Sequence, residues 1–437
     1  MIRAAAICQC LIFSPLVGYA PIGALLHATL LRSTPAANSR LAQPPDTIRL
    51  VFSEPVVPGV SQISLIDAAG NARLLQVSGD PRNVRVLIGR AGPINRGKHT
   101  VSWRILSADG HPIAGSFSFF VESSSAGIVE PTPSSTAQIL PESATGDTLP
   151  TPASTPATSE TSIPLLASVL RGAGLGAFMA GVGLLFFGVT AGDRRKLAPR
   201  VMIVRLTGIG AILLVGHLFA WLLHISPTHD LSGSFIASVF DSMVGQTELL
   251  RVALALLAFL AIALARREVL AVVFGGACLL VSGAIGHPAA IQPYLSIPAK
   301  MAHLVSASLW LGGLLWLVWL SRCDEIACRA EARRVSSVAL IAVIAIFLTG
   351  SLETLLFINS PGDLIHAVYG RLVLLKLLGL VLLVGAGAYN RFALVPRLDE
   401  PGATTKLSRS VRNEIVIVSM VILIGGFLGY VPTPPAP

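Results

Sequence analysis

Hydrophobic residues follow two different patterns in the two parts of this chain. Between residues 27 and 122, short runs alternate apolar with polar positions, as at Ile48, Leu50 and Phe52. Beyond residue 163, apolar stretches of roughly 20 residues recur, separated by polar loops. Alternation with a period of two is typical of strands with one buried face, whereas ~20 apolar residues are enough for a helix to cross a bilayer. The pattern therefore predicts a small all-β domain followed by an all-α bundle of membrane helices.

The β part and its flanking segments can be bounded from composition. Residues 27–122 fit a Greek-key sandwich or barrel of ~95 residues. Residues 1–26 combine Arg3 with an apolar run, which is typical of an export signal. Residues 123–162 are rich in Pro, Ser and Thr and poor in apolar side chains. Because such a segment cannot bury a core, we expect a disordered linker between the two parts.

The membrane part, residues 163–431, holds eight apolar stretches and precedes a short tail at 432–437. The stretches lie at 164–191, 201–224, 248–265, 268–286, 298–320, 335–358, 370–390 and 414–431. The whole chain is 53% hydrophobic and only 13% charged, whereas about a quarter of the residues are charged in soluble domains. We therefore expect a multi-domain membrane protein with about eight transmembrane helices.

Basic residues are confined to alternate loops. The loops after the first, third, fifth and seventh stretches carry Lys and Arg, whereas the loops at 225–247, 287–297 and 359–369 carry none. The positive-inside rule places the basic loops in the cytoplasm. The β-domain and linker then lie on the periplasmic side of a bacterial inner membrane, in agreement with the export signal. Because the net charge of +9 arises between apolar stretches, it does not indicate nucleic-acid binding.

The histidines share one side of this predicted topology. All nine fall on the outer side: His27, His99, His111, His217, His224, His229, His287, His303 and His366. For any single histidine, chance and the interfacial preference of an amphipathic ring are a sufficient explanation. A complete one-sided set indicates a function, and imidazole is a ligand suited to copper, zinc, iron and nickel.

Asp109 and His111 form the most specific local feature of the β part. On an extended segment, two residues that are two positions apart point to the same side. The carboxylate and the imidazole can therefore share one ion. By spacing alone, however, an ordinary turn aspartate beside a surface histidine is the simpler interpretation.

The motifs of residues 27–121 resemble those of the periplasmic copper-binding CopC family. They are His27-Ala28-x-Leu30-x-x-Ser33-x-Pro35, Leu50-Val51-Phe52-Ser53-Glu54-Pro55-Val56, and Asp109-Gly110-His111-Pro112-Ile113-x-Gly115-x-Phe117-x-Phe119. The resemblance implies that His27, as the first residue of the mature chain, binds Cu(II) through its amine and its imidazole, and that Asp109 and His111 complete the site. Glu54 is a candidate for orienting these ligands. Since no methionine lies between residues 2 and 178, we expect a Cu(II) site alone.

Residues 164–431 resemble the membrane family CopD, which implies copper uptake or resistance. The matching motifs are Gly286-His287-Pro288-Ala289, Ala302-His303-Leu304-x5-Trp310-Leu311-Gly312-Gly313, Tyr369-Gly370-Arg371-Leu372-x-Leu374-Leu375-Lys376, Asn390-Arg391-Phe392 and Ser410-Val411-Arg412-x-Glu414. They cover the second half of the bundle, and the first half matches mainly in its pattern of apolar stretches.

His287 and His303 are predicted to form the entry site for copper into the bundle. His287 ends the fourth stretch and the fifth begins near 298, so the two helices should be antiparallel neighbours. His303 would then lie ~7 Å below the start of its helix, at 1.5 Å per residue. Both rings should lie at similar depth on the outer side, and the loop at 287–297 carries no Lys or Arg to repel a cation.

Other polar residues inside the stretches are secondary candidates. His217 and His224 are seven residues apart and share one helix face. Glu353 is a candidate by default, because an ionisable group in a membrane helix is usually functional; an ion pair with Arg371 or Lys376 explains it equally well. Three basic residues are expected to reach the outer interface: Arg171, Arg251 and Lys300.

The predicted function is copper binding in the periplasm and copper transport across, or delivery to, the inner membrane. The expected partners are the copper ion and lipid, with other periplasmic copper carriers as further candidates. Two alternatives remain: a haem-binding electron carrier, since paired histidines can ligate haem, and a copper sensor without transport. No nucleophile constellation indicates an enzyme, and no Gly-x4-Gly-Lys-Ser/Thr loop indicates an ATP-driven pump.

Overall fold

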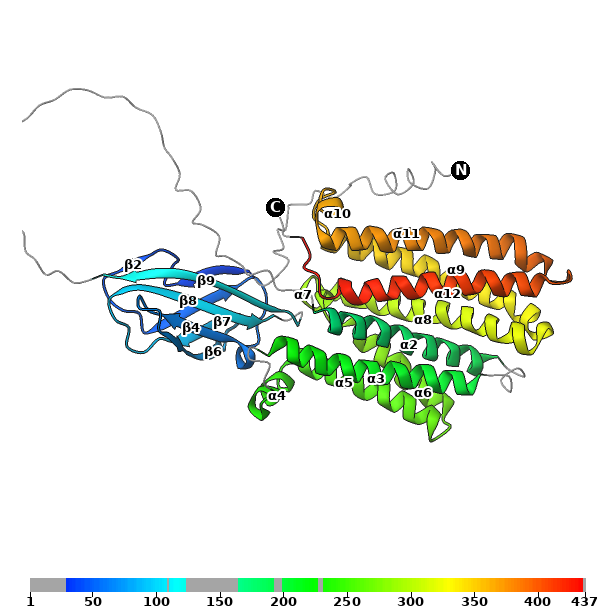
Figure 1. Cartoon of the computed structure of the whole chain (residues 1–437), viewed down its shortest axis with the longest axis horizontal. Helices are drawn as coiled ribbons and strands as arrows, with labels where there is room; N and C mark the ends of the chain where they lie inside the picture. The colour runs from blue at the N-terminus through cyan, green and yellow to red at the C-terminus, as the bar shows by residue number, and fades with distance from the viewer. Residues whose placement is uncertain (1–28, 108–109, 123–163, 192–198, 227–230, 435–437) are drawn as a thin grey trace, which may run out of the picture.

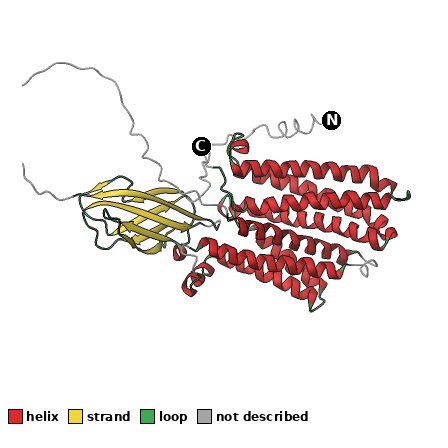
Figure 2. Cartoon of the chain, viewed as in Figure 1, coloured by secondary structure: helices red, strands yellow, loops and turns green. Residues whose placement is uncertain are grey.

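The computed structural model describes residues 29–107, 110–122, 164–191, 199–226 and 231–434. All the strands in the described residues lie at one end of the molecule, and the long helices follow them along the chain (Figure 2). Several predictions concern residues outside the described ranges and are not tested: the export signal, the linker, and the proposed ligands His27 and Asp109.

The β-domain is a sandwich of two sheets, as the alternating pattern predicts. One sheet has the strand order β1-β3-β7-β6 and the other β2-β9-β8-β4-β5. The strands are β1 (Leu30–Thr34), β2 (Arg40–Leu41), β3 (Thr47–Phe52), β4 (Gln62–Ile66), β5 (Ala72–Leu74), β6 (Gln76–Asp80), β7 (Asn83–Arg90), β8 (Gly97–Leu106) and β9 (Pro112–Val121). The hairpin of β8 and β9 is the longest pairing, with its register running from Gly97 opposite Val121 to Leu106 opposite Pro112.

The core of the sandwich is built from alternate residues of both sheets. Ile48, Leu50 and Phe52 on β3 are fully buried. The rings of Phe52 and Trp103 meet edge to face across the sheets, with centroids 5.2 Å apart, a preferred aromatic geometry. Alternation therefore both forms the strands and supplies the apolar layer that holds the sheets together.

In the part of the chain that the structure describes, eight long helices form the bundle, one for each predicted apolar stretch (Figure 1). They are α2 (Leu165–Thr190), α3 (Arg200–Ile225), α5 (Met243–Ala263), α6 (Glu268–Gly283), α8 (Pro293–Cys323), α9 (Glu325–Phe357), α11 (Val368–Tyr389) and α12 (Ala403–Leu428). Within the described residues, seven are long and apolar enough to cross a membrane. The exception is α6, whose 16 residues extend ~24 Å, less than the ~30 Å of the hydrocarbon core.

Several helix boundaries differ from the predicted ones. Helix α8 starts at Pro293 and continues through Pro298, where the stretch was expected to begin. Helix α9 starts at Glu325, with Asp324 as its N-cap, so most of the predicted basic loop at 321–334 is helical. Apolar runs mark where lipid contact begins, but a helix can continue past that point into polar sequence. Three short α-helices within the described residues were not predicted: α4 (Gly233–Phe240), α7 (His287–Ala290) and α10 (Asp363–His366).

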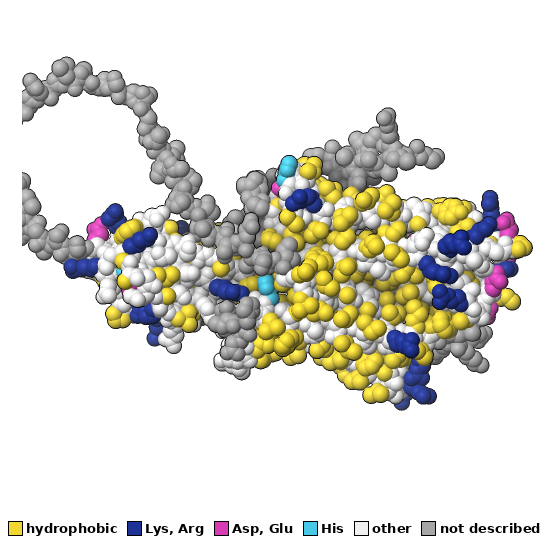
Figure 3. Space-filling model, viewed as in Figure 1, with side chains coloured by type: hydrophobic (Ala, Val, Ile, Leu, Met, Phe, Trp, Pro, Cys, Tyr) yellow, Lys and Arg dark blue, Asp and Glu magenta, His cyan; other side chains and the backbone are white. Residues whose placement is uncertain are grey.

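Helix α2 packs against α3, α6, α8 and α12. Its glycines allow close approach of the backbones, as at Gly183, where a Cβ atom would overlap the Ser308 carbonyl oxygen of α8. Small residues of this kind are typical of helix contacts in membranes. On the face seen in Figure 3, hydrophobic side chains cover the bundle between its ends, and Lys and Arg gather at the end away from the β-domain. The chain is a membrane protein with an apolar belt around its helices.

Candidate functional site

The β-domain contacts the end of the bundle through the turn between β8 and β9 (Figure 1). Trp221 on α3 donates a hydrogen bond from Nε1 to the Gly110 carbonyl oxygen, at 3.1 Å. Arg104 on β8 donates from Nη2 to the carbonyl oxygen of His224, also at 3.1 Å. Partial burial lowers the pKa of Arg104, although a guanidinium stays charged at neutral pH. These polar contacts fix the end of the hairpin over α3.

An apolar cluster extends this contact. Val60, in the short helix η1 (Pro58–Val60), shares a cluster of buried residues with Trp221 on α3 and Val239 on α4. A Cβ atom on the neighbouring Gly59 would lie 3.0 Å from Ser238 Cβ, so η1 and α4 are in close contact. The helix α4, which sequence analysis did not predict, therefore provides part of the surface that holds the β-domain.

His111 and His287 meet at this junction. His111 lies just before β9, and His287 is the first residue of α7. Their rings have centroids 5.2 Å apart and planes inclined by 20°. His287 is buried, and its ring also lies beside Phe357 and Tyr369. The structure thus brings a predicted ligand of the β-domain next to a predicted ligand of the bundle.

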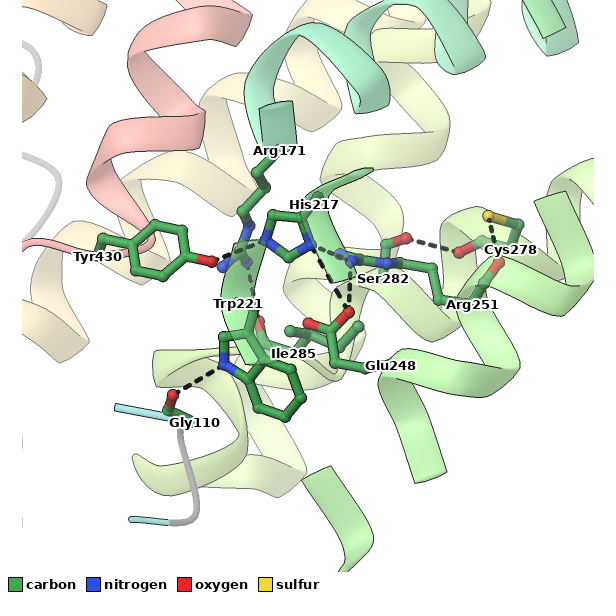
Figure 4. Close-up of polar contacts among 10 residues, drawn as sticks. All are labelled: Gly110, Arg171, His217, Trp221, Glu248, Arg251, Cys278, Ser282, Ile285 and Tyr430. Carbon is green, nitrogen blue, oxygen red and sulfur yellow. Dashed lines mark hydrogen bonds and ion pairs between the residues drawn. The ribbon is translucent and has the colours of Figure 1, made fainter. Parts of the chain in front are cut away.

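His217 belongs to a buried polar network that sequence analysis missed (Figure 4). Arg251 donates from Nη2 to His217 Nδ1 at 2.8 Å and forms an ion pair with Glu248. His217 Nε2 lies 2.7 Å from the hydroxyl oxygen of Tyr430. Arg251 is 1% exposed, so the expectation that it reaches the interface was wrong. The sequence did contain a signal for this network: Glu248 and Arg251 are an i,i+3 pair of opposite charges at one end of an apolar stretch.

Since Arg cannot accept a hydrogen bond, His217 must accept at Nδ1 and carry its proton on Nε2. Both ring nitrogens are therefore engaged, which does not favour haem ligation by this residue. The rings of His217 and His224 lie 6.1 and 6.2 Å from that of Tyr430, in agreement with a shared helix face. A cavity of about 10 Å³ beside this network has room for about one water molecule. Its lining includes Gly110, His111, Arg171, Trp221, Val244, Glu248, Ile285 and Tyr430.

His303 and Glu353 lie farther into the bundle. His303 follows the start of α8 by ten residues, ~15 Å along the axis instead of the expected ~7 Å, because the helix begins earlier. Its Nδ1 lies 3.0 Å from the hydroxyl of Thr349. Glu353 forms an ion pair with Lys300 at 3.3 Å, and not with either partner expected from sequence. One carboxylate oxygen of Glu353 has no hydrogen-bond partner within the described ranges.

The other histidine of the described β-domain has a structural role. His99 is buried, contacts the Asn95 carbonyl oxygen at 2.7 Å and stacks on Phe119. Glu54, which is also buried, lies two residues after the end of β3. Among the residues that the structure describes, no three His, Cys, Asp or Glu side chains are grouped closely enough to hold a metal ion. The proposed set of His27, Asp109 and His111 remains untested.

Comparisons with known proteins assign both domains. Residues 30–122 match the CopC domain family, and residues 329–428 match the family described as copper resistance protein D, or CopD. The copper transport protein CutJ of Bacillus subtilis (strain 168) is 25% identical over 456 residues, which cover 98% of this chain and 77% of CutJ.

Other relatives match one domain each. Copper resistance protein C of Pseudomonas syringae pv. tomato is 35% identical, covering 22% of this chain and 81% of that protein. The inner membrane protein YebZ of Escherichia coli (strain K12) is 32% identical over 28% of this chain and 44% of that protein. The crystal structure of CopC from Methylosinus trichosporium OB3b is 31% identical, covers 22% of this chain and 94% of that one, and has a TM-score of 0.21. The chain therefore belongs to the CopC family through its β-domain, and in the same polypeptide residues 329–428, in the second half of the membrane bundle, match the CopD family.

Proposed function

We propose that this protein binds copper in its β-domain and passes it to the membrane bundle for transport across the bacterial inner membrane. Membership of the CopC family and the match of residues 329–428 to the CopD family support copper as the cargo, and the relative CutJ is named as a copper transport protein. The proposed ligands in the β-domain are His27, Asp109 and His111, and nitrogen-rich sites of this kind favour Cu(II). The proposal is for a binding and transport function, not an enzymatic one.

The observation that carries this proposal is the position of His111. The residue belongs to the β-domain, yet its ring centroid is only 5.2 Å from that of His287 in the bundle. A separate copper chaperone would have to diffuse to its acceptor, whereas here donor and acceptor share one chain. Tethering raises their effective concentration without any additional contact.

The distribution of charge supports an orientation with the β-domain in the periplasm. Lys and Arg gather at the end of the bundle away from the β-domain (Figure 3). Cytoplasmic loops carry an excess of such residues, so the opposite end, where His111 and His287 meet, would face the periplasm. Other periplasmic copper carriers could then load the β-domain from the same compartment.

His303 and Glu353 are the proposed next positions on the route. The Thr349 hydroxyl donates to the Ala345 carbonyl oxygen at 2.7 Å, so it accepts from His303 Nδ1–H. The lone pair of His303 is therefore on Nε2, where it can bind a metal ion. The carboxylate oxygen of Glu353 that lacks a hydrogen-bond partner among the described residues supplies a second candidate ligand one turn beyond Thr349. We propose that copper enters at His287 and then passes His303. This order replaces the expectation that the two histidines form a single entry site at one depth.

Cellular copper content tests the function directly. Cells that express the protein should differ in copper content from cells that lack it: a rise means uptake, and a fall means export. His287→Ala and His303→Ala should abolish the difference at unchanged protein abundance. His366→Ala is the matched control, since His366 is an exposed histidine on the same side of the bundle. Equal copper content with and without the protein would contradict transport.

A further inference from the structure

Three consecutive residues after α12 contact histidines from three separate parts of the chain. We call residues Gly429–Val431 the C-terminal strap. His111 of the β-domain lies with Nε2 2.8 Å from the first carbonyl oxygen of the strap. His287 of α7 lies with Nε2 3.1 Å from the last one. His217 of α3 contacts the hydroxyl of the middle residue at 2.7 Å. The strap therefore links the β-domain to two elements of the bundle.

These contacts determine which nitrogen of each ring carries the proton. A backbone carbonyl can only accept, so His111 and His287 must both donate from Nε2–H. In a neutral imidazole the lone pair is then on Nδ1. A histidine that binds a metal usually donates its other N–H to a carbonyl or carboxylate, which fixes the tautomer and orientation of the ring. His111 and His287 both have this arrangement, with Nδ1 as the atom that can bind a metal.

Tyr430 anchors the strap. Its side chain is 6% exposed, and the guanidinium carbon of Arg171 lies 5.8 Å from the centre of its ring. The rings of His111 and His224 meet it edge to face, with centroids 5.8 and 6.2 Å away. A large buried ring in contact with three elements can hold the backbone on either side in place. Tyr430, together with the buried side chain of Val431, can therefore position the two carbonyl oxygens that orient His111 and His287.

We propose that His111 and His287 form one copper site shared by the two domains, oriented by the C-terminal strap with Tyr430 as its positioning residue. The separation of 5.2 Å between the ring centres is within the ~6 Å that two imidazoles on one ion allow, given metal–nitrogen bonds of ~2 Å. This inference rests on the proposed function. It adds that His287 is the residue of the bundle that receives copper from the β-domain, through a site that both domains share.

Transfer at this site is a ligand exchange without redox change. The ion bound by His111 Nδ1 gains a bond to His287 Nδ1 while the domains are in contact. When the β-domain moves away, the bond to His111 breaks and the bond to His287 remains. No electron is transferred, and each imidazole keeps its Nε2 proton throughout. The ion is thus never released into water between the two domains.

Pulsed electron paramagnetic resonance of the full-length protein, purified in detergent and loaded with one equivalent of Cu(II), tests the site. The method detects the remote nitrogen of each coordinated imidazole. His287→Ala should remove one imidazole from the spectrum while one copper per chain stays bound. His303→Ala should leave the spectrum unchanged, because that ring lies deeper in the bundle.

Two variants of the strap test the positioning role. Tyr430→Ala should alter the spectrum toward that of His287→Ala, whereas Tyr430→Phe, which keeps the buried ring, should retain the native signal. If His287→Ala leaves the spectrum of the copper-loaded protein unchanged, the shared site is wrong although copper binding stands. If Tyr430→Ala has the native spectrum, the strap does not position the site. A full chain that binds no Cu(II) would instead contradict the proposed function.

Discussion

Replacing Trp221 with Phe should weaken the contact between the β-domain and the bundle. The indole Nε1–H donates to the Gly110 carbonyl oxygen, and Trp221 is 3% exposed. Phenylalanine keeps most of the apolar contact but leaves the carbonyl without this donor. Loss of a buried hydrogen bond costs ~1–2 kcal/mol. That corresponds to a change of roughly five- to thirty-fold in the equilibrium between contacting and separated domains.

A buried reporter cysteine can measure this equilibrium. In a background without the five native cysteines, Val60→Cys places a thiol in the apolar cluster between the domains, where Val60 is 7% exposed. A bulky maleimide can react only when the domains separate, so its rate is proportional to the separated fraction. Trp221→Phe should therefore raise the labelling rate roughly five- to thirty-fold.

The matched control places the thiol in the core of the sandwich. Val101 is fully buried within the β-domain, so labelling of Val101→Cys reports unfolding of that domain alone. Its rate should not change in Trp221→Phe. The reasoning is refuted if Val60→Cys reacts at the same rate with and without the Trp221 replacement, or if it reacts as fast as a free thiol in the parent protein.

Three further predictions concern packing and charge. Gly183→Ala should destabilise the bundle severely, because its Cβ would overlap the backbone of α8; Gly276→Ala, with nothing within 4 Å of the added Cβ, should be tolerated in the same thermal denaturation assay. Arg251→Met should lower the free energy of unfolding by ~3–5 kcal/mol, because it leaves a buried carboxylate unpaired. Arg329→Met, at an exposed ion pair, should have a much smaller effect, and equal losses would contradict the argument. His99→Ala should lower the stability of the β-domain by ~1–3 kcal/mol and leave its Cu(II) stoichiometry unchanged, since His99 belongs to the core. If the variant loses copper, His99 is a copper ligand.

Local sequence determined the class of each domain. The alternation at Ile48, Leu50 and Phe52 correctly predicted a strand with one buried face, because the pleat of a strand repeats every two residues. Each apolar stretch likewise corresponds to a long helix, because a helix satisfies its own backbone hydrogen bonds in lipid. These features depend on neighbours in the chain and can therefore be read from the sequence.

Helix ends and burial of charge were decided by tertiary structure. Apolar composition placed the start of α8 near residue 298, whereas the helix begins at Pro293. Arg251 was expected at the interface, but Glu248 and His217 hold it inside the bundle. Hydropathy describes the average environment of a segment and does not identify a partner that neutralises one charge within it.

The junction itself depends on contacts between distant segments. His111 and the Gly429 carbonyl oxygen that it contacts are separated by 318 residues, and His287 and Val431 by 144. The sequence singled out both histidines by their motifs and their predicted side of the membrane. That their rings meet, and that a segment after the last helix orients both, follows from the packing of the sandwich on the bundle. No local periodicity encodes such a pairing, because it depends on surfaces built from residues that are far apart in the chain.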